Sequence, residues 1–102
     1  MSKYHAVKTE IDGFVFDSRA EAARYQNLKL MERSGDIQGL SIHPVYPLVV
    51  NGERIGKYIA DFLYTERGRK IVEDVKGVKT PVYRLKKRLV KALYGIEILE
   101  TA

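Results

Sequence analysis

Cysteine is absent from the 102 residues of the chain, which excludes disulfide bonds, thiolate metal sites and cysteine nucleophiles. Long apolar runs are absent too. The run from Val45 to Val50 is far too short to cross a membrane, and residues 1–7 lack the apolar core of a signal peptide. We therefore expect a cytoplasmic protein with no membrane partner, folded as a single domain over residues 1–102, because two separate cores would each be too small.

Histidine is scarce, and clustered aromatic residues are lacking. The two histidines, His5 and His43, lie far apart in the sequence without acidic companions at the spacing of metal ligands. A histidine metal site or a histidine-based catalytic triad is therefore not expected, and both residues are predicted to be structural or superficial. The seven tyrosines are spread along the chain, which weighs against a base-stacking RNA-binding surface.

Acidic residues are missing from one long stretch, residues 76–91, although the whole chain carries 18 Lys and Arg against 13 Asp and Glu, a formal net charge of +5. The basic residues of that stretch are Lys76, Lys79, Arg84, Lys86, Lys87, Arg88 and Lys91. Such a local positive charge attracts polyanions, including nucleic acids. The alternative is a solvated helix face that supplies only solubility.

Two helices are predicted from their end signals. Ser18 and Glu21 form a capping-box pattern at the start of the first, and Gly35 is placed to end it. The second begins at Thr80 and ends before Gly95. Its apolar stripe consists of Val82, Leu85, Leu89 and Leu93, while Tyr83, Val90 and Tyr94 occupy a further sector that is either extra core or a dimer surface.

Strands are predicted around the pairs Asp12-Gly13 and Asn51-Gly52, which are typical of tight hairpin turns. In chain order, strands are expected at residues 6–11 and 14–16, in an extended stretch over 37–42 and 45–50 that Pro44 and Pro47 interrupt, and at 55–65, 71–76 and 96–99. The last follows a helix and can join the sheet by a crossover connection. The fold class is α+β, in the order ββαβββαβ.

A further turn determines which residues face each other across the hairpin of residues 55–65 and 71–76. If Arg67-Gly68 forms the centre of this turn, Glu66 pairs with Arg69. Equal steps outward then place Asp61 opposite Asp74, with Cβ atoms about 5 Å apart. Two carboxylates at this distance repel each other, and a divalent cation such as Mg²⁺ between them turns the repulsion into attraction.

Strand alternation gives Asp74 and Lys76 the same face, whereas Glu73 points to the opposite face and is excluded from the site. Apolar neighbours around Asp61 indicate that its carboxylate is partly buried and needs a partner. The alternative is that Asp61 caps the chain or pairs locally with Lys76, and that Asp74 is simply an exposed strand residue.

Asp61, followed after twelve residues by Asp74-Val75-Lys76, resembles the signature of the PD-(D/E)XK nuclease superfamily. The family pattern also has a helix with a Glu before the sheet and a basic helix after the Lys strand, and this sequence supplies both. The resemblance covers residues 18–99. Ala60 stands where the motif's name has Pro, a position that varies in the superfamily.

The resemblance implies a restriction-endonuclease-like core, a central mixed sheet flanked by two helices, and a nuclease dependent on Mg²⁺ (or Mn²⁺). It implies phosphodiester hydrolysis to a 5′-phosphate and a 3′-hydroxyl, with no organic cofactor. The metal ligands would be Asp61, Asp74 and the Val75 carbonyl, with Glu21 binding directly or through water. Lys76 would orient the attacking water and offset developing charge.

Glu21 has two interpretations. In a capping box its carboxylate folds back onto the backbone of Ser18. Against this, helical spacing places Glu21 on the same face as Tyr25 and Leu28, the face that should dock on the sheet. An inward carboxylate is a candidate metal ligand, in keeping with the helical Glu that the resemblance implies.

A basic stripe along the second helix, with residues near its N-terminus, is expected to follow DNA phosphates. The residues predicted to bind DNA are Arg24, Lys79, Thr80, Arg84, Lys87, Arg88 and Lys91.

Residues 16–21 and 74–77 resemble small phage and prophage endonucleases, including Holliday-junction resolvases. The expected function is therefore a DNA endonuclease acting on branched or duplex DNA in recombination, repair or processing, within a bacterial or phage-infected cell. A symmetric homodimer would offer paired sites to two strands. The alternative is a non-catalytic nucleic-acid-binding module that keeps the nuclease fold but has no use for opposed carboxylates.

Overall fold

The computed structural model describes residues 7–102; His5 and the predicted start of the first strand at residue 6 lie outside this range. The elements are β1 (Thr9–Ile11), β2 (Phe14–Phe16), α1 (Arg19–Ser34), β3 (Gln38–Ile42), β4 (Val45–Val50), β5 (Glu53–Ile59), β6 (Phe62–Glu66), β7 (Arg69–Val75), α2 (Pro81–Tyr94) and β8 (Leu99–Thr101). The α+β class is confirmed. Neither described helix is long and apolar enough to cross a membrane.

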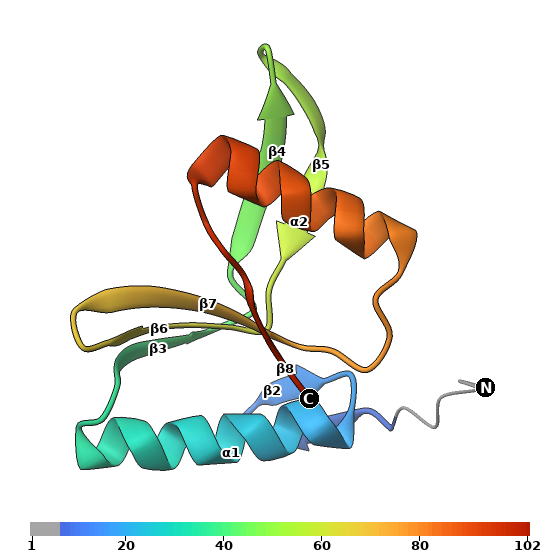
Figure 1. Ribbon diagram of the computed structural model, residues 1–102. Coiled ribbons are helices and arrows are strands. Elements are labelled where there is room, and N and C mark those ends of the chain that lie inside the picture. The colour runs from blue at the N-terminus through green and yellow to red at the C-terminus, as the bar shows by residue number, and fades with distance from the viewer. Residues whose placement is uncertain (1–6) are drawn as a thin grey trace.

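The molecule is built around a four-stranded sheet in the order β3-β6-β7-β8. Helix α1 lies along one face of this sheet, and α2 lies on the other side together with the β4–β5 hairpin, which projects away from the sheet (Figure 1). Two clusters of buried apolar side chains correspond to these sides, one centred on Phe16, Leu28 and Phe62, the other on Leu48, Tyr58 and Val90.

The three predicted two-residue turns form, each with positive φ at both central residues. The turn between β6 and β7 decides the register that matters most. Arg67 has a φ of 52° and Gly68 a φ of 76°, and Glu66 pairs with Arg69. The ladder continues outward to Phe62 opposite Glu73. The predicted register is thus confirmed along the two strands, and Asp61 and Asp74 follow at the open end of the hairpin, where the Asp61 N–H donates to the Glu73 carbonyl.

The single strand predicted over residues 55–65 is wrong, because the chain changes partner at Ala60. Residues before this point pair with β4, and residues after it pair with β3 and β7. The Ala60 N–H donates to the Pro44 carbonyl (3.1 Å), and the His43 N–H donates to the Asp61 carbonyl (3.0 Å). These hydrogen bonds join the β3–β4 connection to the β5–β6 connection, and Asp61 lies in the bend between β5 and β6.

The last strand runs parallel to β7 after the α2 crossover, as expected, but it begins at Leu99 rather than at residue 96. The predicted start is wrong because Ile96 and Ile98 pack into the apolar cluster beneath α2. This shift brings Glu100 beside Asp74 and Thr101 beside Val75.

The buried face of α2 also differs from the predicted apolar stripe. Tyr83 and Val90 are buried, whereas Val82, Leu85 and Leu93 are exposed. The helix is turned so that the Tyr83 hydroxyl reaches Glu100 on β8, donating a hydrogen bond of 2.6 Å. Tyr83 and Val90 therefore belong to the core, and the exposed apolar stripe is left on the surface.

A buried carboxylate joins the layers. Glu73 is 0% exposed and accepts hydrogen bonds from Arg24 on α1 (2.6 and 3.0 Å), Tyr64 on β6 (2.5 Å) and Thr101 on β8 (3.1 Å). These donors hold the pKa of Glu73 below its usual value against the opposing effect of burial. As predicted, Glu73 points away from the face of Asp74.

Arg24→Met is expected to destabilise the protein by about 3–5 kcal/mol, because it leaves the buried Glu73 carboxylate without its charged partner. Urea unfolding would measure the loss. Arg33→Met, on the exposed end of the same helix, is the matched control and should change stability by less than about 0.5 kcal/mol. Equal stability of Arg24→Met and wild type would refute a structural role for Arg24.

Candidate functional site

The two aspartates lie at the open end of the β6–β7 hairpin. Asp61 Oδ2 accepts a hydrogen bond from the Val75 N–H (2.7 Å), and the Asp61 N–H donates to the Glu73 carbonyl (3.2 Å). Burial raises the pKa of Asp61, although the Val75 N–H and Lys76 work against this shift. The alternative in which Asp61 merely caps the chain accounts for one of its oxygens only.

Asp74 is 2% exposed, and its Oδ2 atom has no hydrogen-bond partner among the described residues. Burial raises its pKa to about 6, while Lys76 lowers it. The alternative of an exposed strand residue is therefore wrong. A buried carboxylate oxygen without a donor is costly unless a cation or a proton satisfies it.

Glu21 approaches the same site from α1. The Ser18 hydroxyl accepts from the Glu21 N–H (3.2 Å), so half of the predicted capping box forms. The Glu21 carboxylate, however, lies against Asp61, and its buried Oε2 has no hydrogen-bond partner among the described residues. Burial, followed by the charge of Asp61, raises its pKa to about 7. The inward interpretation of Glu21 is the one that the structure shows.

His43 is the residue that sequence reasoning missed. It lies in the connection between β3 and β4, and one of its ring nitrogens lies within 4.8 Å of carboxylate oxygens of both Glu21 and Asp61. The acidic companions that are absent along the sequence are thus present in space. The only local signal was its position before Pro44, where two predicted strands are interrupted.

Lys76 lies beside Asp74 at the start of the connection to α2. Its Nζ is 3.8 Å from Asp74 Oδ2 and 4.1 Å from the centroid of the Tyr83 ring. The ring face favours a cation at this distance. The Lys76 N–H donates to the Thr101 carbonyl (2.7 Å), which fixes the backbone from which the side chain extends.

Glu100 adds an acidic residue that the sequence did not single out. It accepts from the Tyr83 hydroxyl, and both Lys79 and Lys87 place Nζ 3.1 Å from its carboxylate. These donors lower its pKa to about 2. Unlike Asp74, its neighbour on β7, Glu100 is fully supplied with partners.

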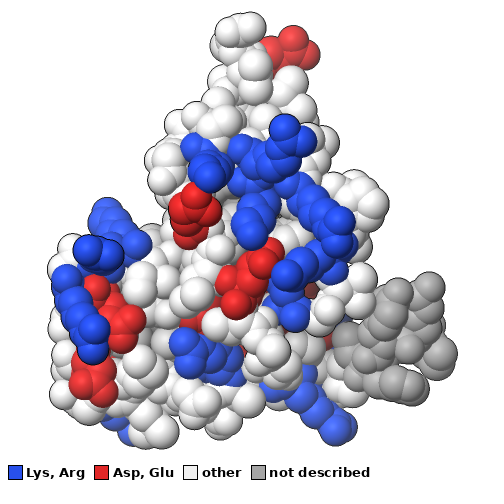
Figure 2. All heavy atoms as spheres, viewed as in Figure 1, with Lys and Arg blue, Asp and Glu red and all other residues white. Residues whose placement is uncertain are grey.

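The predicted DNA-binding residues fall into two groups. Thr80 caps α2 as expected, accepting from the Tyr83 N–H (3.1 Å), and Arg84 and Arg88 are exposed without an ion-pair partner among the described residues. The others pair with carboxylates: Arg24 with Glu73, Lys79 and Lys87 with Glu100, and Lys91 with Glu97. Figure 2 shows basic side chains gathered over α2 and the connection that precedes it.

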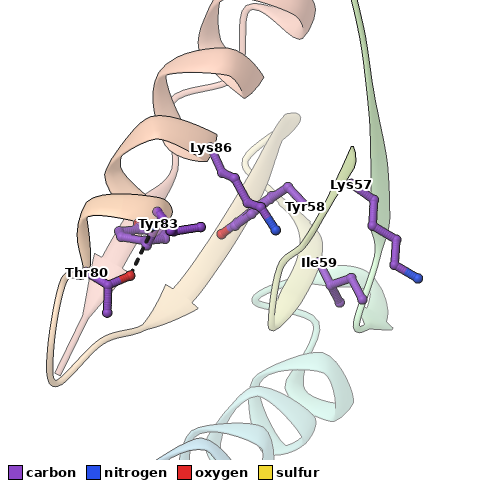
Figure 3. Close-up of a pocket in the computed structure, with 7 residues that line it drawn as sticks. Lys57, Tyr58, Ile59, Thr80, Tyr83 and Lys86 are labelled. Carbon is purple, nitrogen blue, oxygen red and sulfur yellow. Dashed lines mark hydrogen bonds between the residues drawn. The ribbon is translucent and has the colours of Figure 1, made fainter. Parts of the chain in front are cut away.

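A hollow of about 330 Å³ lies between the start of α2 and the end of β5 (Figure 3). Its lining combines two lysines with aromatic and apolar side chains: Lys57, Tyr58, Ile59, Thr80, Val82, Tyr83 and Lys86. The hollow adjoins the site through Tyr83, because the Lys76 ammonium lies over the Tyr83 ring.

Comparison with known proteins identifies the family of the chain but names no activity. No curated protein matches the chain. A family described as a protein of unknown function (DUF1064) matches residues 1–99, and the chain therefore belongs to this DUF1064 family.

Proposed function

We propose that the protein is a metal-dependent endonuclease that hydrolyses phosphodiester bonds in DNA. The observation that carries the proposal is a pair of buried carboxylate oxygens, Glu21 Oε2 and Asp74 Oδ2, that have no hydrogen-bond partner among the described residues. Both belong to residues that the resemblance to PD-(D/E)XK nucleases picks out. Both also lie next to other members of that motif, Asp61 and Lys76.

The donor set fits a divalent cation. Carboxylate oxygens are the preferred ligands of Mg²⁺ and Mn²⁺, and a cation offsets the cost of burying a carboxylate oxygen that accepts no hydrogen bond. Glu21 and Asp61, whose ligand atoms lie within 4.8 Å of each other, would hold the ion. Asp74 lies outside the group within that distance, and Asp74 and the Val75 carbonyl are the further ligands that the resemblance implies. Glu73 cannot take part, because its oxygens already accept from Arg24, Tyr64 and Thr101.

When bound, a divalent cation lowers the pKa of a coordinated water and stabilises the negative charge that develops on the phosphate. Lys76 is the positioning group of this chain, because its ammonium stands between the Asp74 carboxylate and the Tyr83 ring. From there it can donate to the attacking water or to a phosphate oxygen. Tyr83 and Asp74 restrict where that ammonium can move.

The substrate side of the proposal rests on α2. The exposed guanidinium groups of Arg84 and Arg88 are available for phosphates, and the capped N-terminus of the helix presents N–H groups nearby. Branched DNA and a symmetric homodimer remain part of the proposal. The exposed apolar side chains of α2, Val82, Leu85 and Leu93, offer surface that a second copy would bury.

Asp74→Asn is expected to reduce cleavage at least about 100-fold, because it removes a charged ligand without changing the size of the side chain. Labelled four-way junction, flap and plain duplex DNA would be incubated with Mg²⁺, with and without EDTA. Asp36→Asn, in the exposed turn after α1, is the matched control and should cleave like wild type. Substrate bound but left intact by the wild type with either Mg²⁺ or Mn²⁺ would favour the non-catalytic binding module instead.

The cation-free protein is expected to lose stability as the pH rises from about 5 to 7.5. The folded-state pKa values of Glu21 (about 7) and Asp74 (about 6) lie above the ordinary 4.5 and 3.8, so the folded state binds more protons than the unfolded chain in this window. Stability from these groups is complete below their unfolded values and is lost as the pH rises through the folded ones. Glu73 and Glu100, whose pKa values are lowered, stay ionised in both states there.

Thermal melting in EDTA would measure this slope. Glu21→Gln should flatten it, since the amide does not titrate, and Mg²⁺ should raise the melting temperature of the wild type most at the higher pH. An unchanged slope in Glu21→Gln would show that other groups cause the dependence.

The double variant Arg84→Gln/Arg88→Gln is expected to weaken DNA binding and to reduce the salt slope of log K by about 2, one unit for each lost phosphate contact. Fluorescence anisotropy at several salt concentrations would measure both effects. The matched control, Arg33→Gln/Arg67→Gln, removes the same charge from exposed positions on α1 and the β6–β7 turn. Equal losses in the two double variants would mean that α2 is not a specific DNA surface.

A further inference from the structure

We propose that His43 is a direct ligand of the cation, and that its imidazole makes the site prefer a first-row transition ion such as Mn²⁺ over Mg²⁺. The inference rests on the proposed function only in sharing its cation, and it holds whether or not DNA is the substrate. It concerns a residue outside the acidic and lysine motif.

The geometry brings three ligands, two carboxylates and an imidazole, together from three segments. One ligand atom each of Glu21 on α1, His43 after β3 and Asp61 after β5 lie within 4.8 Å of one another. Ligands around one ion at bond lengths of about 2.2 Å are separated by about 3 Å when adjacent and about 4.4 Å when opposite. Small side-chain rotations therefore suffice for all three to bind the same ion.

A second observation, an unsatisfied carboxylate oxygen, indicates that the cluster binds a cation. Glu21 is 8% exposed, and its Oε2 has no hydrogen-bond partner among the described residues. An ion pair between His43 and Asp61 alone would leave this oxygen unsatisfied. A cation shared by the three residues satisfies it.

The backbone of His43 is held in an unusual conformation. Its φ of 53° lies in the left-handed region, where glycine would be less costly. The His43 N–H donates to the Asp61 carbonyl, and the ring packs against Phe16 with centroids 5.8 Å apart. The imidazole is thereby fixed beside the two carboxylates, as expected of a ligand rather than a free surface side chain.

Metal preference follows from the donor atoms. Mg²⁺ favours oxygen ligands and binds imidazole poorly, whereas Mn²⁺ and the later first-row ions accept an imidazole nitrogen together with carboxylates. A site in which His43 supplies one of the donors is therefore more selective against Mg²⁺ than a site made of oxygen donors alone.

The test measures coordination directly, in the whole protein loaded with Mn²⁺. Pulsed electron paramagnetic resonance should show coupling of a nitrogen nucleus to the bound ion in the wild type and in His5→Asn, the variant of the other histidine. The coupling should vanish in His43→Asn, a substitution that tolerates the left-handed backbone. Calorimetric titration should show Mn²⁺ affinity falling at least about 10-fold in His43→Asn and Mg²⁺ affinity changing less than about 3-fold.

His43→Gly, which also suits the backbone, should reproduce the result, and the melting temperatures of both variants in EDTA would verify folding. Absence of nitrogen coupling in the wild type, equal losses for the two ions, or no binding of Mn²⁺ would overturn the proposal. Nuclease activity is scored separately. Cleavage without nitrogen coupling would contradict the role of His43 as a ligand but support the nuclease function. Nitrogen coupling without cleavage would support His43 as a ligand but contradict the nuclease function.

Discussion

The buried carboxylate of Glu73 is the interaction on which the arrangement of the site depends. Its donors come from α1, β6 and β8, so a single side chain on β7 ties the helix to three strands of the sheet. Arg24 lies one helical turn after Glu21, so the ion pair that docks α1 also decides how deeply Glu21 reaches toward Asp61. A charge this deeply buried is costly unless every oxygen is satisfied, as it is here.

Adjacent residues on β7 show two opposite solutions for a buried acid. Glu73 has donors for its oxygens and a lowered pKa, whereas Asp74 keeps an oxygen without a donor and has a pKa raised to about 6. Glu21 resembles Asp74 in both respects. The contrast separates a carboxylate that stabilises the fold from carboxylates whose stabilisation has to come from a proton or a cation.

Glu100 organises the basic side of the molecule in a similar manner. By pairing with Lys79 and Lys87 and accepting from Tyr83, it draws α2 onto β8 and positions the ring that Lys76 covers. Part of the positive charge in residues 76–91 therefore serves the fold, and Arg84 and Arg88 are the exposed remainder. The attraction of nucleic acid by Arg84 and Arg88 stays a prediction.

The sequence by itself determined the turns, the helix ends and the β6–β7 register, because these depend on residues close together along the chain. Arg67-Gly68 sets the register that pairs Phe62 with Glu73 and brings Asp61 and Asp74 to the same end of the hairpin. Ser18 sets the start of the helix that carries Glu21. Only the tertiary structure decided the partner change at Ala60, the rotation of α2, the pairing of Arg24 and the approach of His43 to two carboxylates. Each depends on contacts between residues distant in sequence, where packing and the satisfaction of buried charge outweigh local periodicity.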